Sequence, residues 1–99
     1  MKIPKKIKIG GIDYRVKLIK MGEAPPLTKN HADGETHYDT CMIYLDTSLD
    51  KQRMFQVFLH EIIHALEWGN NFSTSEDYIQ AMSSGLYQVL KDNRLLRNS

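Results

Sequence analysis

Residues 58–67 read Phe58-Leu59-His60-Glu61-Ile62-Ile63-His64-Ala65-Leu66-Glu67, and this stretch decides both the fold and the chemistry we expect. It carries the pattern H-E-x-x-H inside a longer amphipathic segment. Histidines four residues apart project from one helix face, so both imidazoles can reach the same metal ion. Glu61 lies about 100° around such a helix and can accept a proton from a water on the metal. Zinc is the ion we expect, because imidazole and carboxylate ligands suit its tetrahedral site with one open position.

A simpler interpretation makes His60 and His64 surface residues of an amphipathic helix. Placed at about 100° per residue, the two histidines lie on one half of the helix, beside Val57 and Trp68. The other half is apolar and comprises Met54, Phe55, Phe58, Leu59, Ile62, Ile63, Ala65 and Leu66. The apolar neighbours on the histidine side favour a covered cleft, and hence a catalytic metal, over plain solvent.

A catalytic zinc needs a third protein ligand, and no histidine follows His64 in the sequence. The downstream candidates are therefore carboxylates, namely Glu67, Glu76, Asp77 and Asp92. Glu67 shares the helix of the two histidines and converges poorly with them, and Asp92 lies at the far end of the next helix. Glu76 and Asp77 open that helix just after a short turn. We expect Glu76 to be the ligand, with Asp77 as the alternative, although either acid would also stabilise a helix N-terminus.

Candidates for the remaining roles are weaker. A charged tetrahedral intermediate needs a stabilising donor, and His31, His37 and Tyr78 are possible donors. Each is more simply a loop or packing residue. Cys41 alternates with Ile43 and Leu45 and is expected to be a buried, inert thiol.

The flanking sequence predicts a small α+β fold. Alternating apolar residues on either side of Gly10-Gly11 predict a β-hairpin over 6–19. Turn-forming residues predict a loop over 21–36, and strand character returns between 36 and 46, chiefly from Tyr38 to Asp46. A peptide substrate could add as an extra strand to the sheet edge near 41–46.

Two helices follow the strands. Thr47 and Asp50 stand at capping-box spacing and predict a helix over 48–68, ending at Gly69-Asn70-Asn71. The cluster 73–76 predicts the start of a second helix over 75–93. The apolar stripe of this second helix is expected to comprise Ile79, Met82, Leu86, Val89 and Leu90.

Length and composition limit the class of protein. The chain has 99 residues, is 41% hydrophobic and 25% charged, and so predicts one globular domain over 1–99. The apolar runs are too short to span a membrane, and the first residues do not resemble a signal peptide. The single cysteine, Cys41, cannot form an internal disulfide. We therefore expect a cytoplasmic protein without a membrane partner.

Charge is unevenly distributed along the chain. Residues 1–20 hold seven Lys/Arg and one acid, whereas the remainder holds six Lys/Arg and eleven acids. Lysines on the solvent face of edge strands explain this bias most simply, and a nucleic-acid partner is not expected. A second hypothesis is nevertheless a non-enzymatic regulatory or binding module, whose basic N-terminal hairpin binds a partner protein or nucleic acid.

The segment 58–67, with the strand residues Ile43–Asp46 before it and an acid-led helix after it, resembles the ImmA/IrrE-like zinc metallopeptidases. The likeness is greatest to small phage- and prophage-encoded versions and covers about residues 34–93. The resemblance implies a minimal zincin, in which a small, mostly antiparallel sheet packs on the active-site helix. It also implies a third carboxylate ligand from the next helix and peptide-bond hydrolysis of an intracellular regulatory protein. Glu61 would then activate the water, and His60, His64 and Glu76 would hold zinc.

Overall fold

Two glycines set the first turn of the chain. Gly10 and Gly11 have φ values of 59° and 82°, a left-handed conformation that L side chains rarely adopt. They join β1 (Lys6–Ile9) to β2 (Ile12–Ile19) as an antiparallel pair in which Ile9 faces Ile12. The hairpin predicted over 6–19 is confirmed. The structure is a computed structural model and describes residues 2–20 and 33–96.

The second pair of strands differs from the prediction. β3 (Gly34–His37) and β4 (Met42–Asp46) pair antiparallel around a turn at residues 38–41, where one continuous strand from Tyr38 was expected. Cys41 closes that turn with a φ of 57° and is only partly buried, so it is not the core strand residue we predicted. The predicted loop over 21–36 is wrong for residues 34–36, and its part from 21 to 32, with His31, lies outside the described residues.

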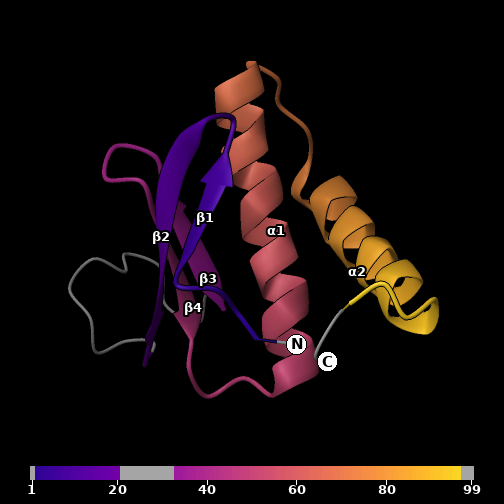
Figure 1. Ribbon diagram of the computed structural model, residues 1–99. Coiled ribbons are helices and arrows are strands. Elements are labelled where there is room, and N and C mark those ends of the chain that lie inside the picture. The colour runs from indigo at the N-terminus through magenta and orange to yellow at the C-terminus, as the bar shows by residue number, and fades with distance from the viewer. Residues whose placement is uncertain (1, 21–32, 97–99) are drawn as a thin grey trace.

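The four strands form one mixed sheet in the order β1-β2-β4-β3 (Figure 1). β2 and β4 are parallel, with Val16 opposite Ile43, whereas the two outer pairs are antiparallel. β4 is therefore interior, and the expectation of a free edge near 41–46 is wrong. β1 and β3 are the edges of the sheet. Lys6 and Lys8 are exposed on β1, each 4.0 Å from Asp13, which agrees with an edge-protecting role.

Helix α1 (Lys51–Asn70) packs across one face of the sheet. Its N-cap is Asp50, whose side chain accepts a hydrogen bond of 2.8 Å from the backbone N–H of Arg53. The predicted start at 48 was therefore early, because Ser48 instead donates to Asp46 in the preceding turn. Asn71, with a φ of 56°, ends the helix in the left-handed conformation.

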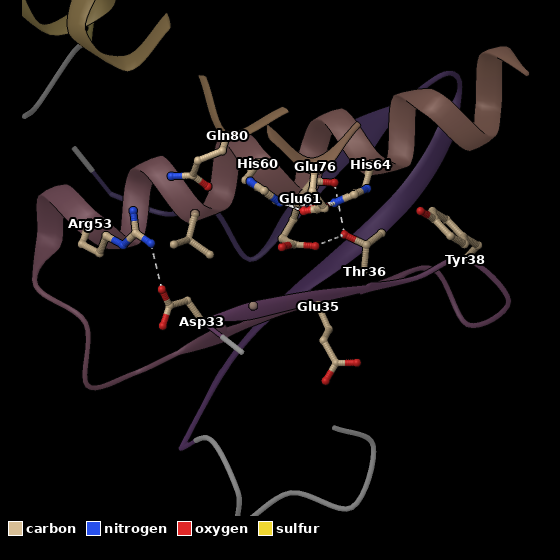
Figure 2. Close-up of a pocket in the computed structure, with 12 residues that line it drawn as sticks. Asp33, Glu35, Thr36, Tyr38, Arg53, His60, Glu61, His64, Glu76 and Gln80 are labelled. Atoms are coloured by element: carbon tan, nitrogen blue, oxygen red, sulfur yellow. Dashed lines mark hydrogen bonds and ion pairs between the residues drawn. The ribbon is translucent and has the colours of Figure 1, made fainter. Parts of the chain in front are cut away.

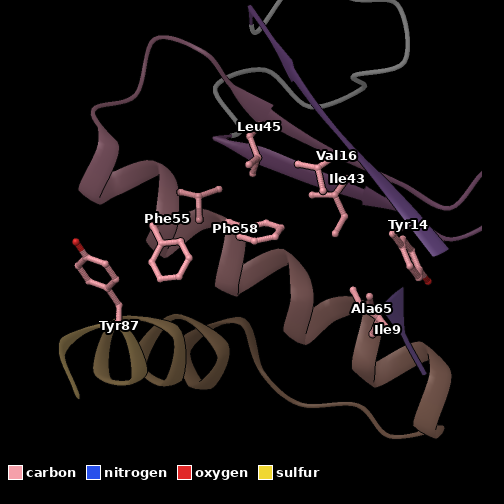
Figure 3. Close-up of a cluster of buried hydrophobic side chains, with 10 residues drawn as sticks. Ile9, Tyr14, Val16, Ile43, Leu45, Phe55, Phe58, Ala65 and Tyr87 are labelled. Carbon is pink, nitrogen blue, oxygen red and sulfur yellow. The ribbon is translucent and has the colours of Figure 1, made fainter. Parts of the chain in front are cut away.

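The core lies between α1 and the sheet, with Tyr87 of α2 completing one end (Figure 3). Phe55 and Phe58 of α1 pack there, and Phe55 also meets Tyr87 edge-to-face at 5.4 Å between ring centroids. The buried cluster comprises Ile9, Tyr14, Val16, Ile43, Leu45, Phe55, Val57, Phe58, Ala65 and Tyr87. This packing fixes α1, and with it the H-E-x-x-H segment, against the sheet.

Helix α2 (Glu76–Asp92) packs on the side of α1 away from the sheet (Figure 1). It begins within the predicted cluster 73–76, where Ser75 is the N-cap and accepts a hydrogen bond of 3.1 Å from the backbone N–H of Tyr78. Its predicted apolar stripe is confirmed at Ile79 and wrong beyond it, because the other buried residues are Ser83 and Tyr87. Met82, Leu86 and Val89 are instead exposed, because a helix that rests on one neighbour buries a narrow stripe at four-residue spacing.

Neither helix in the described part of the chain combines the length and the apolar character needed to cross a bilayer.

Candidate metal centre

The two histidines of the H-E-x-x-H segment point to the same place. His60 and His64 lie one turn apart in the middle of α1, and their Nε2 atoms are 3.2 Å apart. Their side chains are mostly buried, at 15% and 24% exposure. The interpretation of two unrelated surface histidines therefore does not fit the geometry.

Glu76 completes a group of three. Its carboxylate oxygens lie 3.2 and 3.3 Å from Nε2 of His60, and Oε1 lies 2.6 Å from Nε2 of His64. Ser75 caps α2 immediately before Glu76, and Figure 2 shows the Glu76 carboxylate beside the rings of His60 and His64. Within the described residues, His60, His64 and Glu76 form the one group of at least three such side chains that could hold a metal ion. Asp77 and Asp92 are not part of it.

Glu67, which the sequence offered as a candidate third ligand, instead makes two hydrogen bonds. Its Oε1 accepts a hydrogen bond of 2.9 Å from Nδ1 of His64, and its Oε2 accepts from the backbone N–H of Thr74 at 2.7 Å. In the neutral imidazole, a proton on Nδ1 that is donated to Glu67 leaves Nε2 with the lone pair that a metal ion needs. The second hydrogen bond ties the same carboxylate to the turn that leads into Glu76. Glu67 thus connects the two elements that supply the group.

Glu61 lies beside the histidines and is buried, at 6% exposure. Thr36 of β3 donates a hydrogen bond of 2.6 Å to Glu61 Oε1, and the same hydroxyl oxygen lies 3.1 Å from the Glu61 carbonyl oxygen. Burial raises the pKa of Glu61 above its ordinary value, while the hydrogen bond from Thr36 and the two imidazoles oppose this rise. These opposing influences suit a carboxyl that must both accept and release a proton.

Gly34 allows the sheet to approach the helix at this point. A Cβ on Gly34 would lie 2.8 Å from Cγ1 of Val57 and 2.9 Å from the carbonyl oxygen of Tyr44, and Cγ of Glu61 would be 3.3 Å away. Any larger residue would push β3 away from α1. The close approach brings Thr36 within reach of Glu61.

A cavity of about 520 Å³ opens over this group, between β3, α1 and the first turns of α2 (Figure 2). One end is closed by Arg53, whose guanidinium lies 3.0 Å from Asp33. Tyr38 lies at the other end, and burial together with the Glu67 and Glu61 carboxylates raises its pKa, so its phenol stays protonated. The lining comprises Asp33, Gly34, Glu35, Thr36, Tyr38, Arg53, Val57, His60, Glu61, His64, Glu76 and Gln80.

Two of the three donors suggested by sequence, His37 and Tyr78, are absent from the lining of this cavity, and the third, His31, lies outside the described residues. His37 packs edge-to-face on Tyr44 at 5.1 Å and lies 3.6 Å from Glu35. Tyr78 is exposed, and neither residue lines the cavity. Sequence reasoning missed Thr36, which lies in β3, and Tyr38, the first residue of the turn that was mistaken for part of a strand.

Comparisons of this chain with family models, with curated proteins and with solved structures gave no match. What the site can do chemically therefore follows from its own residues.

Proposed function

We propose that this domain is a zinc-dependent metallopeptidase of minimal zincin type, which hydrolyses peptide bonds with His60, His64 and Glu76 as zinc ligands. The observation that carries the proposal is the convergence of three ligand atoms from two helices. Two donors bound to zinc at about 2.05 Å in a tetrahedral arrangement lie about 3.3 Å apart. The spacings of 3.2 Å between the imidazole nitrogens and 3.2–3.3 Å from His60 to Glu76 agree with this value. The 2.6 Å from His64 Nε2 to Glu76 Oε1 is a hydrogen-bond distance and would lengthen when an ion binds between the two atoms.

The donor set also fits a catalytic rather than a structural site. Three protein ligands leave the fourth position of a tetrahedral ion open. The cavity is lined by all three candidate ligands, and Glu61 lines it too without joining the ligand group. A bound zinc ion would supply Lewis acidity, polarising the substrate carbonyl and lowering the pKa of a water near it.

The residues of this chain carry the proton transfers. Glu61 accepts the proton of the attacking water and delivers it to the leaving amine. Thr36 holds the Glu61 carboxylate through the 2.6 Å hydrogen bond, which fixes its orientation. Tyr38 is the donor we assign to the developing oxyanion, because its protonated phenol lines the same cavity.

An extended substrate would lie along β3, the sheet edge next to the cavity, instead of along 41–46. Asp33 accepts a backbone hydrogen bond from Asp46, so in antiparallel alternation Gly34 and Thr36 direct their backbone groups away from β4. Both residues line the cavity. A peptide strand could pair with these groups and pass over His60 and His64. A regulatory protein in the cytoplasm is the substrate class we propose, on the family resemblance and the lone cysteine.

The test compares wild-type protein with Glu61→Gln. The glutamine side chain would keep an oxygen to which Thr36 can donate, so the fold and the metal should be retained. We expect one bound zinc per chain in both proteins and a 10²–10⁴-fold slower hydrolysis by the variant. A degenerate peptide mixture, followed by mass spectrometry, serves as substrate because it presumes no sequence.

Equal hydrolysis by both proteins would exclude Glu61 as the base. Failure of the wild type to bind zinc stoichiometrically would exclude the enzyme and favour the second hypothesis, a non-enzymatic binding module acting through its basic hairpin.

A further inference from the structure

A second hollow adjoins the cavity over the histidines. It has a volume of about 510 Å³ and is lined by Glu35, Thr36, His37, Tyr38, Asp39 and Trp68. Glu35, Thr36 and Tyr38 also line the first cavity, so the two share a wall along the end of β3. Any chain lying on the β3 edge would pass both.

Trp68 forms one side of this hollow and is oriented by stacking. Its indole lies parallel to the Tyr38 ring, with 5.7 Å between centroids and 8° between planes. It is nevertheless 57% exposed, although tryptophan usually buries most of its surface. One face rests on Tyr38, so the exposed surface belongs to the opposite face and the ring edge. A rigid, solvent-facing indole is a platform for a planar or cationic group.

The charges around Trp68 are negative. Asp39 is the acid of the lining that we consider, because the Glu35 carboxylate lies 3.6 Å from His37 Nε2 and points away from the histidines (Figure 2); the described lining contains no lysine or arginine. In the adjoining cavity the described lining has one arginine, Arg53, which is paired with Asp33. An apolar ligand could stack on Trp68 but would gain no interaction with the Asp39 carboxylate. A guanidinium group stacks on indole and also pairs with carboxylates.

We propose that the hollow beside Trp68 binds the arginine side chain of an extended peptide, stacked on the indole and paired with Asp39. The inference rests on the proposed function for the course of the peptide along β3. Trp68 follows His64 by one helical turn, which is about 6 Å along α1. Side chains on one face of a strand repeat at about 6.8 Å. The arginine therefore lies within two residues of the bond that is cut, on the His64 side.

Trp68 is the single tryptophan of the chain, so its fluorescence reports binding directly. The probes are acetylated, amidated alanine hexapeptides with one arginine, titrated into the metal-free protein, where no hydrolysis interferes. We expect a saturable change in Trp68 emission. Citrulline has the same shape without the charge and should bind at least tenfold more weakly, as should leucine. An unchanged emission, or equal binding of arginine and citrulline peptides, overturns the proposal.

Two variants locate the contact. Asp39→Asn should weaken binding of the arginine peptide about fivefold and leave the citrulline peptide unaffected. Asp92→Asn is the matched control, because Asp92 is an exposed acid at the far end of α2 and should change neither affinity. Equal losses from both variants would indicate a general charge effect and overturn the assignment to Asp39.

Hydrolysis separates this inference from the proposed function. With zinc bound, Trp68→Leu should lower the ratio of kcat/KM for arginine peptides to kcat/KM for citrulline peptides at least tenfold. Any effect of the variant through the Tyr38 ring, on which Trp68 stacks, is common to both peptides and cancels in this ratio. Cleavage that shows no preference for arginine, in the wild type and in Trp68→Leu, overturns the inference and leaves the peptidase standing. Arginine-selective binding with no difference in hydrolysis between wild type and Glu61→Gln overturns the peptidase and leaves the arginine site standing.

Discussion

The two helices are both amphipathic, yet the fold holds them very differently. α1 contacts β1, β3, β4 and α2, whereas α2 packs on α1 alone among the described elements. His60 and His64 are therefore fixed by the core, while Glu76 is 64% exposed on a helix restrained from one side. Packing in the core therefore holds two of the three candidate ligands in place. The third comes from the least restrained helix.

The largest expected effect is the difference in unfolding free energy between truncating a core residue of α1 and truncating an exposed residue of α2. Phe58 is 2% exposed, and Phe58→Ala removes a ring that packs between α1 and the sheet. We expect the free energy of unfolding to fall by about 3–5 kcal/mol. Met82→Ala on α2 is the matched control, because Met82 is 47% exposed and its loss should cost less than about 0.5 kcal/mol. Urea unfolding measures both, and similar losses would contradict the one-sided packing of α2.

Bound zinc should stabilise α2 against local opening more than it stabilises the rest of the fold. If Glu76 is a ligand, any opening that releases α2 from α1 breaks a bond to the metal. At free zinc about a hundredfold above its Kd, the stabilisation against such openings is about 2.7 kcal/mol, or a hundredfold slower amide exchange. Hydrogen exchange followed residue by residue should show this slowing along α2.

Two neighbouring acids provide the control for the zinc prediction. Glu76→Gln should abolish the zinc-dependent slowing, whereas Asp77→Asn should retain it, because Asp77 lies outside the ligand group. Zinc binding without added protection of α2 would show that Glu76 is not the third ligand.

Adding a side chain at Gly34, where β3 lies close to α1, should have an intermediate effect on the free energy of unfolding. Gly34→Ala places a Cβ 2.8 Å from the Val57 side chain and 2.9 Å from a backbone oxygen, and the backbone cannot move as a side chain can. We expect a loss of about 1–3 kcal/mol in the free energy of unfolding. The Thr36–Glu61 hydrogen bond should lengthen too, so zinc-dependent hydrolysis should fall more than stability explains. Unchanged stability would mean that β3 can shift without cost.

The features predicted correctly from sequence are those set by local physics. The glycine turn, the start of α2 within 73–76 and the helical spacing of His60 and His64 each depend on residues within a few positions of one another. Glu76 could also be chosen, because a short turn limits which acids can fold back on α1. In each case the short stretch of chain contains the whole reason for the structure.

The features missed depend on contacts between distant residues. β3 is four residues long, without an alternating apolar pattern, and exists because β4 pairs with it. The Thr36–Glu61 hydrogen bond joins residues 25 apart in sequence, which no local pattern reveals. On α2, the periodicity identified the apolar side chains but could not show that its neighbour covers a narrower stripe, centred on Ser83. Patterns identify which face is apolar, and tertiary packing decides which face is buried.

The smallest of these effects should come from Gly85→Ala, and the informative result is whether the substitution raises or lowers the free energy of unfolding. A Cβ at Gly85 meets nothing within 4 Å, and no left-handed backbone requires glycine there. Glycine in a helix interior costs up to about 1 kcal/mol relative to alanine, so Gly85→Ala should stabilise the protein by up to that amount. Thermal unfolding at several protein concentrations measures it. A loss in place of the gain would mean that another surface rests on the exposed face of α2, and the contrast between the helices would then not hold in solution.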